Sequence, residues 1–227
     1  MRRAYLEAHC PLPESFKLAR RWAGPRVTVI ASSTSAIEAS EWLPRVGLPL
    51  GVTSHRRSRY TARPVGTVIA WCLDLEEILD VESGPEVGGV VSVRAFDQHP
   101  PWVTAHQVEH LGGHELEATS EAGAALKATV EGITMLPVVN QGLIDSRERS
   151  AAVQALTYLR QHGHTLDPSQ LVVEAIRNEW PRRSPLDLAR IAKDLNAGKR
   201  LRYQPRLSVE SLAQVGGARL SGNEATQ

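Results

Sequence analysis

The sequence predicts an α/β fold, with a mostly parallel sheet of about five strands and flanking helices, followed by a C-terminal helical extension. Short apolar runs rich in Val and Ile alternate with helical patterns up to about residue 142, and only helical patterns follow. Continuous apolar runs are typical of buried parallel strands, and their alternation with helices indicates right-handed crossovers. A chain of 227 residues that is 42% hydrophobic can bury such a core.

The predicted strands are apolar runs of five to eight residues, as in RVTVI and GVVSVRAF. Helical spacing of apolar residues separates most of them. Periodicity leaves open that one or two of the runs are core helix segments, because short apolar runs fit both structures. The predicted strands are 26–30, 48–53, 65–71, 89–96 and 133–139, and the predicted helices between them are 35–43, 75–81, 101–111 and 121–130.

Three helices are predicted after residue 142. The first is capped by Asp145 or Ser146 and stops near Gly163, and the next two, over 168–180 and 185–197, begin with a capping residue followed by proline. Four segments are therefore expected: an N-terminal arm (1–19), a Rossmann-like α/β domain (20–142), a helical domain (143–206) and a partly disordered tail (207–227).

Charge is sorted along the chain, although the net charge is only +1. Residues 1–60 hold ten Lys and Arg against four Asp and Glu, residues 61–170 hold six against fifteen, and residues 171–206 hold nine against four. Arginine suits phosphate through its planar fork, so these basic stretches predict a phosphate-binding or nucleic-acid-binding face. The alternative is that the acidic middle neutralises them within the fold or across an oligomer. The candidate residues are Arg56, Arg57, Arg59, Arg182, Arg183, Lys199, Arg200 and Arg202.

The expected carboxyl edge of the sheet is the other candidate site, because open parallel sheets bind ligands there. Ser32, Ser33 and Thr34 follow the first predicted strand, where hydroxyls and free N–H groups at a helix start can hold an anion. The alternative is plain helix capping, which serine favours in any case. Neither GxGxxG nor GxxxxGK[ST] is present.

The sequence suggests two candidate metal sites. Asp74 and Asp97 follow two predicted strands and could share Mg²⁺, unless each caps the next helix. His106 and His110 fit the letters HxxEH, which on a helix would place two zinc ligands on one face with Glu109 as general base. Surface histidines without a metal are the alternative for that pair.

The function expected from these observations is a nucleic-acid-associated or nucleotide-phosphate-binding protein, accessory rather than catalytic. The alternatives are a hydrolase dependent on zinc or magnesium, and a scaffold whose charged patches bind a protein partner or further copies of the chain. Cys10 and Cys72 are too few for a disulfide framework, and neither a signal peptide nor a membrane span is apparent. A cytoplasmic protein without a membrane partner is therefore expected.

Overall fold

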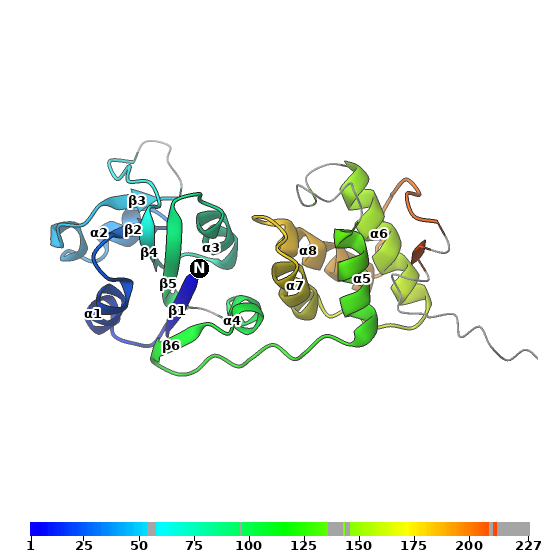
Figure 1. Ribbon diagram of the computed structural model, residues 1–227, viewed down its shortest axis with the longest axis horizontal. Coiled ribbons are helices and arrows are strands. Elements are labelled where there is room, and N and C mark those ends of the chain that lie inside the picture. Colours follow the sequence, from blue (N-terminus) through cyan, green and yellow to red (C-terminus); the bar gives the residue numbers. More distant parts are fainter. Residues whose placement is uncertain (54–57, 96, 136–142, 144–145, 209–210, 213–227) are drawn as a thin grey trace, which may run out of the picture. The chain divides into compact units, whose positions relative to one another are not determined.

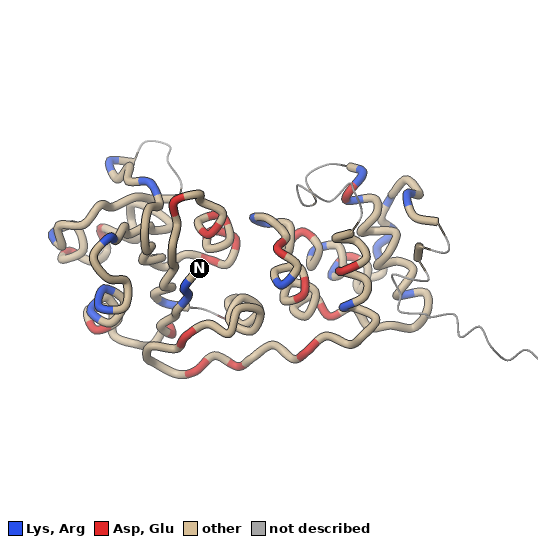
Figure 2. The backbone as a smooth tube through the Cα atoms, in the orientation of Figure 1, with Lys and Arg blue, Asp and Glu red and all other residues tan. Residues whose placement is uncertain are grey.

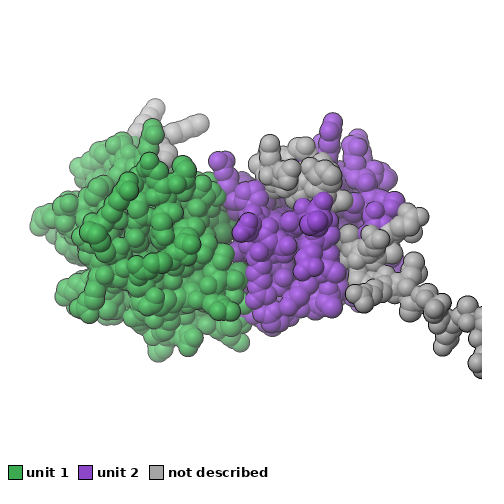
Figure 3. All heavy atoms as spheres, in the orientation of Figure 1, with its two compact units in different colours: residues 1–118 green, residues 119–227 purple. Residues whose placement is uncertain are grey.

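The computed structural model describes residues 1–53, 58–95, 97–135, 143, 146–208 and 211–212. The chain forms two compact units, Met1–Ala118 and Thr119–Gln227 (Figures 1 and 3). The elements of unit 1 are β1 (Arg2–Glu7), α1 (Leu12–Ala23), β2 (Val27–Ala31), α2 (Thr34–Glu38), η1 (Leu43–Arg45), β3 (Leu50–Val52), β4 (Gly66–Trp71), α3 (Leu75–Glu82), β5 (Val87–Ala95), α4 (Pro100–His106) and β6 (Glu109–Gly112). The elements of unit 2 are α5 (Ala124–Thr134), α6 (Ser146–Gln161), α7 (Pro168–Arg177) and α8 (Ser184–Asn196).

The α/β fold class is confirmed, with a sheet of six parallel strands in the order β3-β2-β4-β5-β1-β6. This order differs from the usual doubly wound orders, because β1 lies between β5 and β6 rather than beside β2. The expected arm over 1–19 is therefore wrong. β1 pairs on both sides, and Ala4, Tyr5 and Leu6 are buried.

Apolar side chains of the central strands meet in register across the sheet. Val29 pairs with Ile69, Ile69 with Val91, and Val91 with Ala4, and all four are fully buried. Helices α1 and α2 cover this face, while α3 and α4 lie on the other (Figure 1). Burial on both faces explains why β2, β4 and β5 are continuous apolar runs in the sequence.

Unit 2 has a helical core of its own, to which α5 contributes Leu126, Val130 and Ile133. The strand expected over 133–139 is wrong at its start, because Ile133 and Thr134 end α5, and residues 136–139 lie outside the described residues. Helix α5 packs on α6 and α7, so the boundary between the units falls at residue 118 rather than 142. Leu207 and Leu212 also enter this core, which corrects the expected start of the tail.

Residues 113–123 connect β6 to α5 without helix or strand. This segment contains Glu115, Glu117 and Glu121 and no Lys or Arg (Figure 2). Glu121 anchors its end to unit 2 through Arg177 Nη2, 2.8 Å from Glu121 Oε1. Among the described residues, no helix has the length and apolar character needed to cross a bilayer.

Candidate functional site

The carboxyl edge of the sheet carries Ser32, Ser33 and Thr34 directly after β2, as predicted. The chain leaves β2 for β3 on one side and returns to β4 on the other side of β2. The ends of β2 and β4 therefore flank a topological switch point, the usual ligand position in open sheets.

The hydroxyl groups of Ser33 and Thr34 have partners within the fold. Ser33 caps α2 by accepting a hydrogen bond from the third helical N–H at 3.1 Å, and Thr34 Oγ1 lies 2.9 Å from Ser58 Oγ. The carbonyl of Ser32 accepts a hydrogen bond from Thr53 Oγ1 at 3.1 Å. Helix α2 has only five residues, so its N-terminus is a weak dipole for an anion. The capping alternative describes Ser33, and the geometry gives no support to an anion site here.

The aspartates proposed for Mg²⁺ have separate roles. Asp74 caps α3 by accepting from the Glu77 N–H at 2.8 Å, while Glu77 Oε2 accepts from the Asp74 N–H at 2.9 Å. Asp97 is exposed in the turn after β5. Within the described ranges, no three His, Cys, Asp or Glu side chains gather as metal ligands would.

The structure contradicts the prediction that His106 and His110 share one helix. Helix α4 ends at His106, Gln107 adopts a left-handed conformation with φ of 50°, and Glu109 and His110 belong to β6. The helix expected over 101–111 is therefore wrong beyond His106. His106 and His110 do not share a helix face, and the geometric argument for a shared zinc ion is lost.

Each of these histidines has a structural environment of its own. His106 Nε2 lies 4.0 Å from Glu82 Oε2, and burial, with the nearby charge of Arg3, lowers the pKa of His106 to about 4. His110 stacks on Tyr5 with ring centroids 4.9 Å apart.

Cys72 and Arg94 lie at the ends of β4 and β5, and both have left-handed backbones, with φ of 56° and 65°. Burial raises the pKa of the Cys72 thiol even though the guanidinium of Arg94 beside it acts in the opposite direction. A thiol that stays protonated is a poor nucleophile, so this position carries no catalytic proposal.

Of the arginines predicted in the first basic stretch, Arg56 and Arg57 lie outside the described residues. Arg59 Nη2 lies 2.8 Å from Glu38 Oε1, and its guanidinium lies 5.1 Å from the ring of Tyr60. This geometry fits internal pairing, which the sequence left open for such residues.

The arginines between α7 and α8 are also engaged. Arg182 occupies the turn with a φ of 51°, and Arg183 Nε lies 3.1 Å from Asp187 Oδ2. Arg190 Nη1, one turn further along α8, lies 3.4 Å from Asp187 Oδ1. Asp187 thus neutralises part of this stretch.

The last basic stretch lines two pockets of unit 2. We call residues 198–206 the strap, an extended segment that follows α8 and runs along α6. The larger pocket, of about 500 Å³, is lined by Lys199, Arg200 and Tyr203 of the strap and by Arg160 of α6, among others. The smaller pocket, of about 260 Å³, is lined by Arg149, Ser146 and Ser150 of α6 and by Arg202, Tyr203 and Gln204 of the strap.

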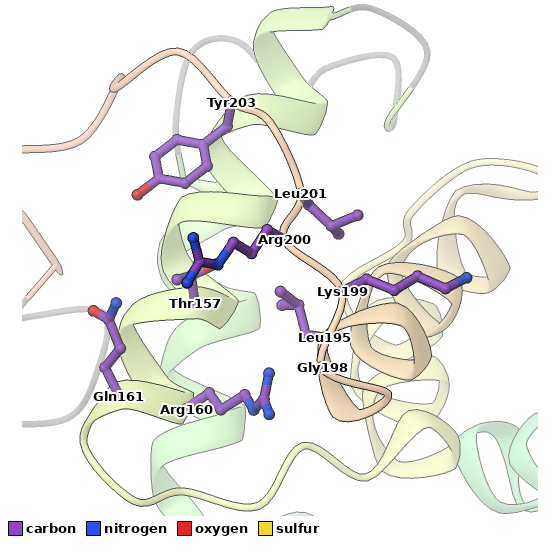
Figure 4. Close-up of a pocket in the computed structure, with 9 residues that line it drawn as sticks. All are labelled: Thr157, Arg160, Gln161, Leu195, Gly198, Lys199, Arg200, Leu201 and Tyr203. Atoms are coloured by element: carbon purple, nitrogen blue, oxygen red, sulfur yellow. The ribbon is translucent and has the colours of Figure 1, made fainter.

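Figure 4 shows how the side chains of the larger pocket lie. Arg200, Arg160 and Tyr203 lie on one side of the strap together with Gln161, whereas Lys199 points away from them. Lys199 Nζ lies 2.6 Å from Asp194 Oδ1, so it is paired outside the group. Of the predicted strap residues, Arg200 therefore lines the larger pocket without an ionic partner among the described residues.

Four arginines of the two pockets share an electrostatic feature. Arg149, Arg160, Arg200 and Arg202 make no ion pair and no side-chain hydrogen bond with any described residue. Arg177 of α7 is the contrast, because its guanidinium lies within 2.9 Å of carboxylate oxygens of both Glu121 and Glu174.

Sequence reasoning missed Arg149 and Arg160, which lie within the stretch with an acidic balance. Their spacing was the available signal: eleven residues make just over three full helical turns, so both project from nearly the same side of α6.

Gln154 of α6 fixes the strap. Its Oε1 accepts hydrogen bonds from the N–H groups of Arg206 at 2.7 Å and Leu207 at 2.9 Å, and its Nε2 donates to the Leu207 carbonyl at 2.9 Å. The Gln204 N–H also donates to Ser150 Oγ at 3.3 Å. The pocket arginines of the strap thus depend on side chains of α6 for their position.

Residues 124–215 match a protein-family model described as a domain of unknown function (DUF1889). The match covers less than half of the chain, and it includes α5–α8 and the strap. No curated protein matches the chain, and no solved structure matches it.

Proposed function

We propose that unit 2 binds a phosphate-bearing polyanion, with nucleic acid as the foremost class, through the two pockets beside the strap. The observation that carries this proposal is the set of four arginines without acidic partners among the described residues, placed around recessed surfaces. Arginines brought together repel one another, and a phosphate backbone removes that repulsion while accepting bidentate hydrogen bonds.

The arginines come from two elements, so the site depends on the fold and not on one charged run. Arg149 and Arg160 are separated along α6, and Arg200 and Arg202 face them from the strap. A backbone with several phosphates can contact residues of both pockets, whereas a single phosphate cannot use all four cations.

The test is binding of labelled oligonucleotides to the full chain, measured by fluorescence anisotropy over a range of salt concentrations. If each arginine releases about one counterion, the log–log slope of the affinity should be roughly −0.7 to −0.9 per contacted phosphate. Arg160→Gln and Arg200→Gln should each make the slope shallower by about that amount and weaken binding.

Arg190→Gln is the matched control, because it also removes one charge but from an arginine paired with Asp187. Absence of binding to any oligonucleotide at low salt would overturn the proposal, as would equal weakening by all three variants. Sizing at low and high salt distinguishes the scaffold alternative, because ionic self-association weakens as salt rises.

A further inference from the structure

We infer that the pockets beside the strap prefer single-stranded to double-stranded nucleic acid, with one unstacked base lying on the ring of Tyr203. The inference rests on the proposed function and names the substrate class of the same site. Tyr203 is the residue common to the linings of both pockets.

The ring of Tyr203 is available for stacking. Tyr203 is 38% exposed, and it makes no ring contact with a described residue. The other three tyrosines all have a ring or cation beside them: Tyr5 stacks on His110, Tyr158 lies 4.0 Å from His162 between ring centroids, and Tyr60 has the guanidinium of Arg59 nearby. An exposed tyrosine without such a partner leaves an apolar face in water, which a base would cover.

Each of the two pockets that share Tyr203 holds two of the four arginines. Arg200 and Arg160 belong to the larger pocket, while Arg202 and Arg149 belong to the smaller one. In a nucleic-acid strand, phosphates likewise flank each base. The order of cation, aromatic ring and cation therefore matches phosphate, base and phosphate in one strand, which is the combination typical of sequence-tolerant single-strand binding.

A duplex cannot use the same arrangement in full. Its bases are stacked on one another and present only their edges in the grooves, so a ring at a pocket lining has no base face to contact. The arginines would still attract the duplex backbone. We therefore expect duplex binding to be weaker and to be independent of the Tyr203 ring.

The experiment compares a mixed-sequence 20-nucleotide strand with its own duplex, using the full chain and anisotropy at one salt concentration. Tyr203→Ala should weaken single-strand binding by about 5- to 150-fold, the range expected for loss of one base–aromatic stack. Tyr203→Phe, which keeps the ring, should stay within about twofold of the natural chain, whereas Tyr203→Leu should resemble Tyr203→Ala.

The outcomes separate the inference from the proposed function. If Arg160→Gln and Arg200→Gln weaken binding but Tyr203→Ala does not, or if the duplex binds as tightly as the single strand, the stacking inference is overturned and the proposed function stands. If neither nucleic acid binds, or if an acidic polypeptide such as polyglutamate binds more tightly than both, the nucleic-acid assignment itself is overturned. Unchanged circular dichroism of the Tyr203 variants confirms that the fold is intact.

Discussion

Replacing Gln154 with leucine tests whether α6 positions the strap. Gln154 is only 8% exposed, and leucine preserves most of its volume while removing its amide. The substitution deletes three hydrogen bonds, two accepted from the N–H groups of Arg206 and Leu207 and one donated to the Leu207 carbonyl.

The expected loss of stability follows from those three bonds. Each contributes about 1 kcal/mol net, and a buried group left without a partner costs about 1–3 kcal/mol. Leu207 is 8% exposed, so its N–H and carbonyl reach water only if the strap moves away from α6. That movement limits the cost, and we expect a local loss of about 2–3 kcal/mol.

Hydrogen exchange of the full chain measures this loss where it occurs. The amides of Arg206 and Leu207 should exchange roughly 30- to 150-fold faster in Gln154→Leu, while the amides in the middle of α7 should keep their rates. Gln161→Leu is the control, because Gln161 is an exposed residue of the same helix. Unchanged exchange at 206–207 would refute the argument that Gln154 holds the strap.

Three further predictions concern the two cores. The buried Trp180 indole N–H donates to Thr134 Oγ1 at 2.7 Å, and Thr134→Val removes this acceptor. The variant should destabilise unit 2 by about 1–3 kcal/mol in urea unfolding, measured by the fluorescence of Trp180, the one tryptophan of that unit. An unchanged midpoint would contradict this prediction. Gly66→Ala should destabilise unit 1 by about 2–4 kcal/mol in thermal unfolding, because φ is 70° and a Cβ would lie 2.5 Å from the Arg26 carbonyl oxygen. Gly88→Ala in the same unit should be much milder, because its Cβ would meet its nearest atom at 3.8 Å, an ordinary contact. Burial and the charge of Arg3 lower the pKa of His106 from 6.5 to about 4, so between these pH values the imidazole is protonated in the unfolded chain and neutral in the folded one. The free energy of unfolding should therefore fall as the pH drops from 6.5 to 4. His106→Gln should flatten this dependence, and equal pH slopes for the two proteins would disprove the reasoning.

Much of the fold was predictable because burial leaves a clear pattern. β2, β4 and β5 are buried on both faces and therefore appear as apolar runs. Helix α7 starts where Asp167 accepts hydrogen bonds from two first-turn N–H groups, in agreement with the capping signal in the sequence.

Other elements depend on contacts that no local pattern records. β1 begins with Arg2 and Arg3 and ends with Glu7, so its apolar stretch is only three residues long. β6 was hidden within an extended helical pattern because Gln107, not a glycine, ends α4 in a left-handed conformation. β1 and β6 pair with each other, so their strand conformation depends on a tertiary contact and not on a local pattern.

Only half of the candidate site was predictable from the sequence. Arg200 and Arg202 stood out as part of a basic stretch, but their partners on α6 come from the acidic part of the sequence. Only the path of the strap along α6 unites them. The basic pattern does not distinguish them from Lys199 and Arg183, whose charges are paired by Asp194 and Asp187 in the folded chain.

The interior place of β1 has a consequence for biosynthesis. Its neighbour β5 is synthesised later, since Ala4 pairs with Val91, and at about 5–20 residues per second the delay is about 4–17 s. β6 emerges later still, so the first strand must wait with its apolar residues unpaired while the ribosome completes both flanking strands. The sheet can therefore close on both sides of β1 only after residue 112 has been made.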